Sequence, residues 1–118
     1  MKEVRAVNHT KGSTLAGRVK VASNLWSRFW GLMGKRGLGE DEALLIDPCY
    51  SVHTMFMRFP IDVVYLTGDN HVLKIADDMR AWRASVGKGA KRVLEMPSGG
   101  AARQGLEAGD EIIFEPSG

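Results

Sequence analysis

Two β-branched runs with a tight reversal between them constrain the fold of this chain most strongly. The first run covers residues 61–67 and the second covers residues 71–76, and only Gly68, Asp69 and Asn70 separate them. β-Branched residues favour extended backbone, and Gly, Asp and Asn accept the positive φ angles of a tight turn. The pattern predicts a β-hairpin and therefore a sheet with antiparallel strands.

Other short extended segments surround this hairpin. Residues 18–23 alternate basic and apolar side chains, residues 43–46 are an apolar run, and residues 91–96 form a further run that Pro97 ends. A helical turn near residues 101–104, a stop at Gly105 and a closing strand through Ile112 and Phe114 follow. We expect a mainly β fold, α+β at its margin: a small, partly open barrel or sandwich of about six to eight short strands with one or two short helices.

Residues 23–34 are the best candidate for a longer helix. Ser23 can cap its first turn, Gly34 can close it, and apolar residues occupy positions 25, 26, 29, 32 and 33. A chain of 118 residues has the length of one domain. We expect a single domain over residues 1–118, with a core at about 14–115 and residues 1–12 as a mobile leader.

The segment from Cys49 to Leu66, CYSVHTMFMRFPIDVVYL, contains the main chemical candidates. Its alternation predicts a strand over residues 52–59, with His53, Met55 and Met57 on one face and Arg58 on the other. Pro60 has no backbone donor, so a kink or strand edge is expected just before Asp62.

Composition excludes several classes of protein. Cys49 is the only cysteine, which rules out an intramolecular disulfide and a cysteine-rich metal site. The first residues lack an apolar stretch typical of a secretory signal, and the apolar runs are far shorter than the ~20 residues of a membrane span. We expect a soluble, cytoplasmic protein without a membrane span or a cofactor.

Charge is distributed unevenly along the chain. Residues 1–38 contain eight basic residues and one acid, a net charge of +7, whereas residues 39–118 carry 8 − 13 = −5. The basic residues are spread singly and no aromatic nucleic-acid motif accompanies them, so we expect a mixed surface and consider a nucleic-acid partner unfavoured. A basic N-terminal face that binds an acidic partner remains an alternative.

Cys49 and His53 could form a nucleophile and base, because an imidazole can stabilise a thiolate. In extended chain their α-carbons lie roughly 13 Å apart, so only a turn could bring the side chains together. We favour a buried Cys49 and a hydrogen-bonded His53, and we assign no catalytic residue. No pair of donors has the spacing of a zinc site, so we assign no metal ligand.

Three acids are assigned structural roles. Asp62 and Glu95 lie inside apolar strands, where each carboxylate needs a partner such as an arginine or a loop amide. Asp110 follows Gly109 in a predicted turn.

A possible binding patch combines apolar and cationic side chains: His53, Met55, Met57, Arg58, Trp82 and Arg83. Met and Trp supply adaptable apolar contact, and Arg supplies a planar donor for a carboxylate or phosphate. If these residues meet, they predict a small pocket for an anionic or amphipathic ligand.

Several motifs resemble the domain of unknown function 192 (DUF192) family of small bacterial and archaeal proteins. They are Gly31-Leu32-Met33-Gly34-Lys35, the stretch from His53 to Met57 that leads to Pro60-Ile61-Asp62, Val93-Leu94-Glu95 with Gly99-Gly100, and Gly105-Leu106 with Gly109-Asp110. The resemblance covers residues 18–114 and implies a compact, partly open barrel with a packed helix. It implies no established reaction, substrate or cofactor. Many similar proteins look exported through a leader that we do not expect here.

We therefore expect a non-catalytic binding or accessory module with an unknown small ligand or protein partner. One alternative is a small hydrolase or acyl-transfer enzyme that uses His53 with Cys49 or Asp62. The other is an interaction subunit that uses the basic N-terminal face.

Overall fold

The computed structural model describes residues 2–24, 37–55 and 57–116. Residues 25–34, which make up most of the helix expected over residues 23–34, and Phe56 lie outside this part of the chain. The elements are β1 (Lys2–Asn8), β2 (Ser13–Ala22), β3 (Glu42–Ile46), β4 (Ser51–His53), β5 (Ile61–Leu66), β6 (Val72–Met79), β7 (Ala84–Val86), β8 (Arg92–Pro97), α2 (Gly100–Arg103) and β9 (Ile112–Pro116).

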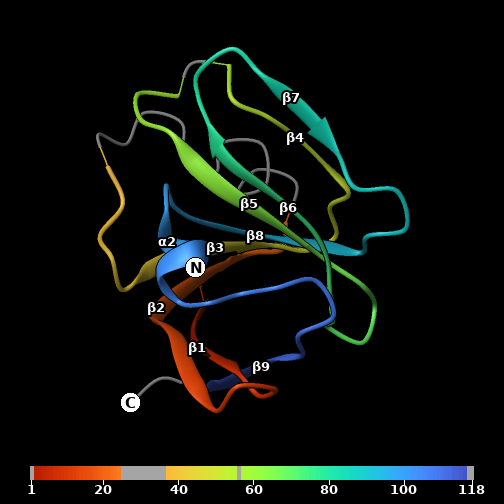
Figure 1. Ribbon diagram of the computed structural model, residues 1–118. Helices are drawn as coiled ribbons and strands as arrows, with labels where there is room; N and C mark the ends of the chain where they lie inside the picture. The colour runs from red at the N-terminus through yellow and green to blue at the C-terminus, as the bar shows by residue number, and fades with distance from the viewer. Residues whose placement is uncertain (1, 25–36, 56, 117–118) are drawn as a thin grey trace.

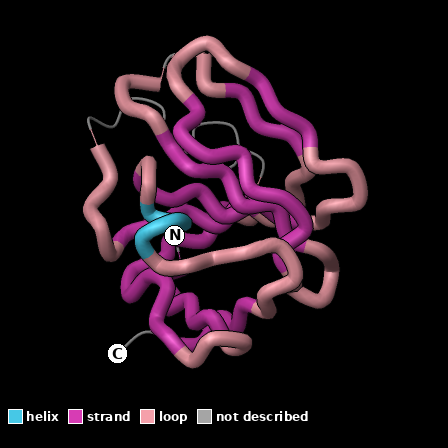
Figure 2. Tube along the Cα trace, in the orientation of Figure 1, coloured by secondary structure: helices cyan, strands magenta, loops and turns pink. Residues whose placement is uncertain are grey.

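Seven of these strands form one curved sheet in the order β6-β5-β8-β3-β2-β1-β9, and β4 pairs with β7 in a second, two-stranded sheet (Figures 1 and 2). All pairs are antiparallel except β2 with β3. A single bridge between His71 and Glu111 brings the start of β9 to the start of β6. The large sheet therefore curls toward itself without closing, in agreement with the expected mainly β, partly open architecture.

The hairpin that the sequence predicts is present as β5 and β6. Asn70 takes a positive φ of 64° in the turn between them. The predicted helical turn is α2, after which Gly105 adopts a φ of 65° and the N–H of Leu106 donates to the carbonyl of Ala101 at 2.9 Å. This arrangement ends the helix and buries Leu106.

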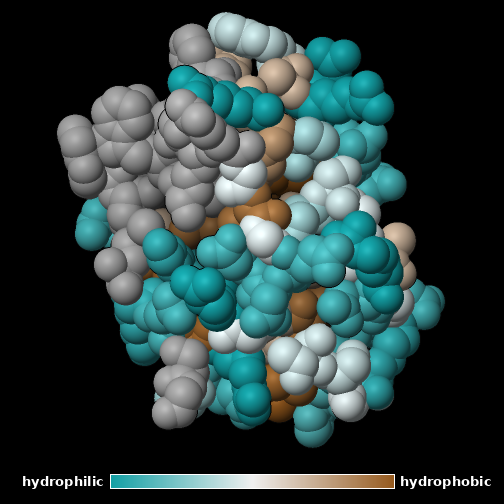
Figure 3. Space-filling view, turned by 90° about the vertical axis from the view of Figure 1, so that its left-hand side faces the viewer, coloured by the Kyte–Doolittle hydropathy of each residue, from teal (hydrophilic) through white to brown (hydrophobic). Residues whose placement is uncertain are grey.

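Two apolar layers occupy the two faces of the sheet. One layer fills the concave side of the barrel, with Leu15, Val64 and Leu94 among its members, and α2 contributes Ala101 to it. The other layer covers the outer face of β3, β8 and β5, and Val52 of β4 packs into it. Hydrophilic residues dominate the described part of the surface in Figure 3, with hydrophobic residues showing between them.

Two sequence predictions need correction. The strand expected over residues 52–59 stops at His53, and the chain turns so that the N–H of Met57 donates to the carbonyl of Thr54 at 3.1 Å. The core does not begin near residue 14, because β1 pairs with both β2 and β9 and buries Val4 and Ala6. The alternation of these apolar residues with charged ones was the signal of a strand within the expected leader.

Candidate functional site

Thr54 joins the two segments that carry the predicted binding residues. This side chain is fully buried, and its hydroxyl donates to the carbonyl of Arg80 at 2.5 Å and accepts from the N–H of Arg83 at 2.8 Å. The backbone N–H of Thr54 also donates to the carbonyl of Arg83 at 2.8 Å, and the N–H of Trp82 donates to the carbonyl of Thr54 at 3.2 Å. Thr54 therefore holds residues 53–55 against residues 82–83.

The paired strands β4 and β7 with their flanking residues, 50–55 and 82–86, form a unit that we call the lobe (Figure 1). In its ladder Ser51 faces Val86 and His53 faces Ala84, and all four residues are exposed. The chain direction reverses at Trp82, which has a φ of 63°. Its outer surface also exposes large apolar side chains: Trp82 at 61%, Tyr50 at 62%, Val86 at 56% and Met55 at 40%.

The chain around the lobe contains bases but no acids. Residues 48–61 and 79–94 include no Asp or Glu, whereas they include six Lys and Arg residues: Arg58, Arg80, Arg83, Lys88, Lys91 and Arg92. Arg80 pairs with Asp78 at 3.5 Å and Arg92 pairs with Asp47 at 3.4 Å. The other four have no ion pair within the described residues, so the segments that form and flank the lobe together carry an excess of positive charge.

The structure brings together most of the predicted binding patch. His53, Met55, Trp82 and Arg83 meet in the lobe, and Arg58 is exposed nearby in sequence. Met57 does not belong to this surface, because its side chain is buried in the outer apolar layer. The sequence analysis missed Thr54, although it was the one uncharged polar residue between His53 and Pro60.

Two polar side chains lie on the face of the sheet that packs against the lobe. The phenol oxygen of Tyr65 makes no hydrogen bond of normal geometry in the described structure. Burial raises the pKa of this phenol, and a contact with Ser85 of β7 opposes the change. Glu95 lies beside Val63 and Leu44 in the same layer, and burial raises the pKa of its carboxyl to about 7.

Asp62 is an internal acceptor of backbone hydrogen bonds. One carboxylate oxygen accepts from the amides of Asp78 at 2.9 Å and Gly99 at 3.2 Å, and the other accepts from Ala101 at 3.0 Å. These contacts tie β5 to the end of β6 and to the start of α2. Loop amides, and not an arginine, satisfy this buried acid.

The residue pairs of the alternative enzyme hypothesis are not assembled in the described structure. The Cys49 thiol donates to the carbonyl of Ser51 at 3.1 Å, and His53 is exposed on the outer face of the lobe. No hydrogen bond joins His53 to Cys49 or to Asp62 among the described residues. Nor does that part of the chain contain three or more His, Cys, Asp or Glu residues grouped to hold a metal ion.

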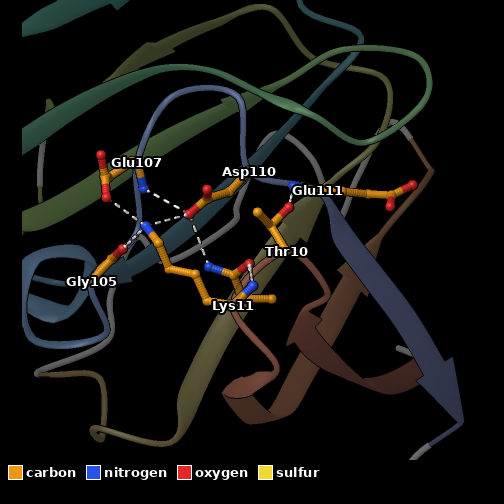
Figure 4. A network of polar contacts seen from close by, with 7 residues as sticks. Thr10, Lys11, Gly105, Glu107, Asp110 and Glu111 are labelled. Carbon is orange, nitrogen blue, oxygen red and sulfur yellow. Dashed lines mark hydrogen bonds and ion pairs between the residues drawn. The ribbon is translucent and has the colours of Figure 1, made fainter.

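Asp110 organises a separate polar network at the barrel end (Figure 4). Its carboxylate accepts from the buried Asn8 side chain at 3.0 Å and from Lys11 at 3.0 Å, and Lys11 also contacts Glu107 and the carbonyl of Gly105. Although burial alone would raise it, the pKa of Asp110 is lowered by hydrogen bonds from Asn8, from the amide of Glu107 and from Lys11. This network fixes the loop before β9 on the turn after β1.

Basic residues of the N-terminal part pair with acids from the rest of the chain. Arg5 contacts Glu115, Lys11 contacts Glu107 at 2.7 Å, and Arg18 lies 3.9 Å from Glu42. These pairs create the mixed surface that the sequence analysis favoured. In the described part of the chain, four cations without an ion pair lie in the acid-free segments that form and flank the lobe: Arg58, Arg83, Lys88 and Lys91.

One cavity of about 430 Å³ opens at an end of the barrel, away from the predicted patch. None of the six predicted binding residues lines it. Within the ranges 2–24, 37–55 and 57–116, no helix has the length and apolar character that crossing a membrane requires.

The amino-acid sequence is similar to a family of known proteins. The sequence model of the DUF192 family, described as "Uncharacterized ACR", matches residues 6–114. A UPF0127 protein of Thermococcus sibiricus is 35% identical over 114 residues, which are 92% of this chain and 73% of the relative. A UPF0127 protein of Pyrococcus furiosus is 32% identical over 112 residues, with 90% and 94% of the two chains covered.

Two solved structures share the fold. A Sinorhizobium meliloti protein named as a "putative transcription regulator" has a TM-score of 0.83 and 22% identity, with 96% of this chain and 92% of that chain covered. A protein of unknown function from Novosphingobium aromaticivorans has a TM-score of 0.79 and 23% identity, with coverage of 94% and 83%. Both similarities cover nearly the whole of this chain.

Proposed function

Because the chain belongs to the DUF192 family, whose description is that of an uncharacterised group, we propose a function from its own surface: a non-catalytic binding module whose lobe takes an acidic protein segment with apolar side chains. The observation that carries this proposal is the exposure of Trp82 and Met55 among cations that have no ion pair within the described ranges. His53, Arg58 and Arg83 supply the polar part of the surface.

The apolar contribution to the proposed binding comes from side chains on the outer face of the lobe. Trp82 and Met55 expose 61% and 40% of their surfaces, and burial of such a side chain is worth roughly 1.5–3 kcal/mol. Exposed Trp and Met are typical anchors of interfaces, because each offers much contact area. The hydrogen bonds of Thr54 hold the two segments together before a partner arrives, which lowers the entropy that binding must overcome.

The electrostatic contribution comes from the absence of acids in residues 48–61 and 79–94. Arg83 and Lys88 are exposed there and have no ion pair in the described structure. A surface with one sign of charge accelerates association with the opposite charge, and this gain falls as salt rises. An acidic partner therefore fits the lobe better than a neutral one.

The alternatives receive less support. An enzyme that uses His53 with Asp62 would need a contact between them, whereas the oxygens of Asp62 face three backbone amides. A partner for the N-terminal face would compete with the ion pairs of Arg5, Lys11 and Arg18.

The test is a binding titration with a fluorescein-labelled peptide in which Glu alternates with Leu and Phe. A matched peptide with Lys in place of Glu controls for charge, and Lys2→Ala controls for an exposed cation outside the lobe. We expect the Glu peptide to bind, and Trp82→Ala and Arg83→Ala each to weaken binding about tenfold, which corresponds to about 1.4 kcal/mol. Equal binding of both peptides, or tighter binding to duplex DNA or phosphatidylglycerol vesicles, would overturn the acidic-peptide assignment.

A further inference from the structure

The cavity at the open end of the partly open barrel is lined by neighbouring register positions of four strands. Lys2 of β1 faces Val21 of β2, Val21 faces Leu45 of β3, and Val4 of β1 faces Pro116 of β9. These residues line the cavity of about 430 Å³. Helix α2 lies toward the other end, where Asp62 at the start of β5 binds the amide of Ala101. One barrel end is thus covered by α2, and the other is open as a concave mouth.

One part of the wall of this mouth is apolar, and charged or polar side chains form the rest. Leu45 and Val4 are buried, and Val21 and Phe114 are partly buried and pack against the inner core. They come from four different strands and converge on one space. The volume lies within the range of about 300–1,000 Å³ typical of small-molecule sites, and barrel mouths are a frequent location for them.

Arg92 is held rigidly at the edge of the mouth. Its Nη1 donates to the side-chain oxygen of Asn70 at 2.5 Å and to the carbonyl of Gly68 at 3.3 Å, and its Nε lies 3.4 Å from Asp47. Only 22% of its side chain is exposed. These contacts of the described residues use Nη1 and Nε, which leaves the N–H groups of Nη2 for a ligand.

Two of the three acids that line the mouth are matched by cations. Asp47 pairs with Arg92, and Glu115 pairs with Arg5. A cationic ligand would therefore compete with existing ion pairs. A carboxylate instead meets a preorganised guanidinium, whose planar donors match its two oxygens.

We propose that the barrel mouth is a second binding site, independent of the lobe, for a small monocarboxylate with an apolar chain or ring. The carboxylate accepts hydrogen bonds from Arg92, and the apolar part packs on Val21, Leu45 and Phe114. The fixed guanidinium gives the site its selectivity for acids, and the apolar wall gives it affinity for the rest of the molecule.

The test compares octanoate, octan-1-ol and octylamine, titrated into the ¹⁵N-labelled full chain and followed by amide chemical shifts. We expect octanoate to cause saturable shifts at residues 4, 21, 45 and 114, with at least tenfold weaker binding of the alcohol and the amine. Arg92→Gln should reduce the affinity for octanoate to that for octanol. Val21→Phe, which fills the mouth and keeps Arg92, should weaken both ligands.

Four outcomes overturn the proposal: no saturable shift with octanoate, equal affinity for octanol in the native sequence, full octanoate binding by a folded Arg92→Gln variant, or unchanged binding by Val21→Phe. If Arg92→Gln fails to fold, the alcohol comparison and Val21→Phe decide the question. Val21→Phe, which lies outside the lobe and its flanking segments, should leave peptide binding at the lobe unchanged, so the two assignments fail separately.

Discussion

The carboxylate of Asp62 accepts a hydrogen bond from the backbone N–H of Ala101 at 3.0 Å, across 39 positions of sequence. The same side chain also accepts from the amides of Asp78 and Gly99, and it is fully buried. A single acid thereby holds the hairpin and the helical turn in one arrangement.

Replacement of Asp62 by Ala should destabilise the fold strongly. Three amides would lose their acceptor, and an unsatisfied buried donor costs about 1–3 kcal/mol. We expect the free energy of unfolding to fall by about 3 kcal/mol or more in urea denaturation. Asp62→Asn, which keeps one acceptor oxygen, should lose less. A loss below about 1 kcal/mol for Asp62→Ala would show that the three contacts are not important for stability.

Glu95 should make stability depend on pH. Burial raises its native pKa from 4.5 to about 7, so between these values the native state holds a proton that the unfolded chain has released. The stability that protonated Glu95 contributes to the native state is therefore fully present below about pH 4.5, and it is lost as the pH rises through 7. It amounts to about 3 kcal/mol in total.

The matched variant Glu95→Gln remains neutral and should remove this dependence. Urea denaturation at pH 5 and pH 8 should show a loss of stability for the native sequence and a much smaller change for the variant. The lowered pKa values of Asp69, Asp78 and Asp110 act in the opposite direction, below about pH 4. Equal pH slopes for both proteins would contradict a protonated, buried Glu95.

Thr54→Val should loosen the lobe while keeping the shape of the side chain. The N–H of Arg83 loses its bond to the hydroxyl, and the carbonyl of Arg80 loses its donor. We expect a loss of about 1–3 kcal/mol in stability and faster hydrogen exchange at the amide of Arg83. Thr54→Ser keeps the hydroxyl and should retain most of the protection. Unchanged exchange in Thr54→Val would show that the hydroxyl does not hold the lobe.

Gly87 should tolerate no side chain. A Cβ at this position would lie 2.3 Å from Cδ1 of Tyr65, whose ring is fully buried. Gly87→Ala should therefore lower stability by about 1–3 kcal/mol, as overpacking of a core does. Gly37→Ala is the control, because no atom lies within 4 Å of its added Cβ. Equal thermal midpoints for the two variants would contradict the close packing at Tyr65.

Local sequence patterns predicted the secondary-structure elements whose formation depends on residues close together in the sequence. The hairpin follows from two β-branched runs and a short turn, and the end of α2 follows from Gly105 and Leu106. Tertiary contacts decided the rest. The strand at residues 52–59 is cut short because Thr54 binds residues 80–83, which no local pattern indicates.

Long-range pairing was also beyond the sequence patterns. The parallel contact of β2 with β3 and the place of β1 between β2 and β9 bring together residues that are far apart in the chain. The lobe could be predicted only as a set of candidate residues, since the pairing of His53 with Ala84 joins two short strands that are far apart in the sequence. Arg92 carried no sequence signal, because its partners Asp47 and Asn70 lie in separate turns.

The most direct test of the lobe as a binding surface is its hydrogen-exchange footprint. Exchange of the full chain should be measured residue by residue, with and without a saturating amount of the Glu-containing peptide. We predict protection at residues 51–55 and 82–86 that is reduced in Trp82→Ala at the same peptide concentration. Protection confined to β1 and β2, or none at all, would contradict the assignment of the lobe.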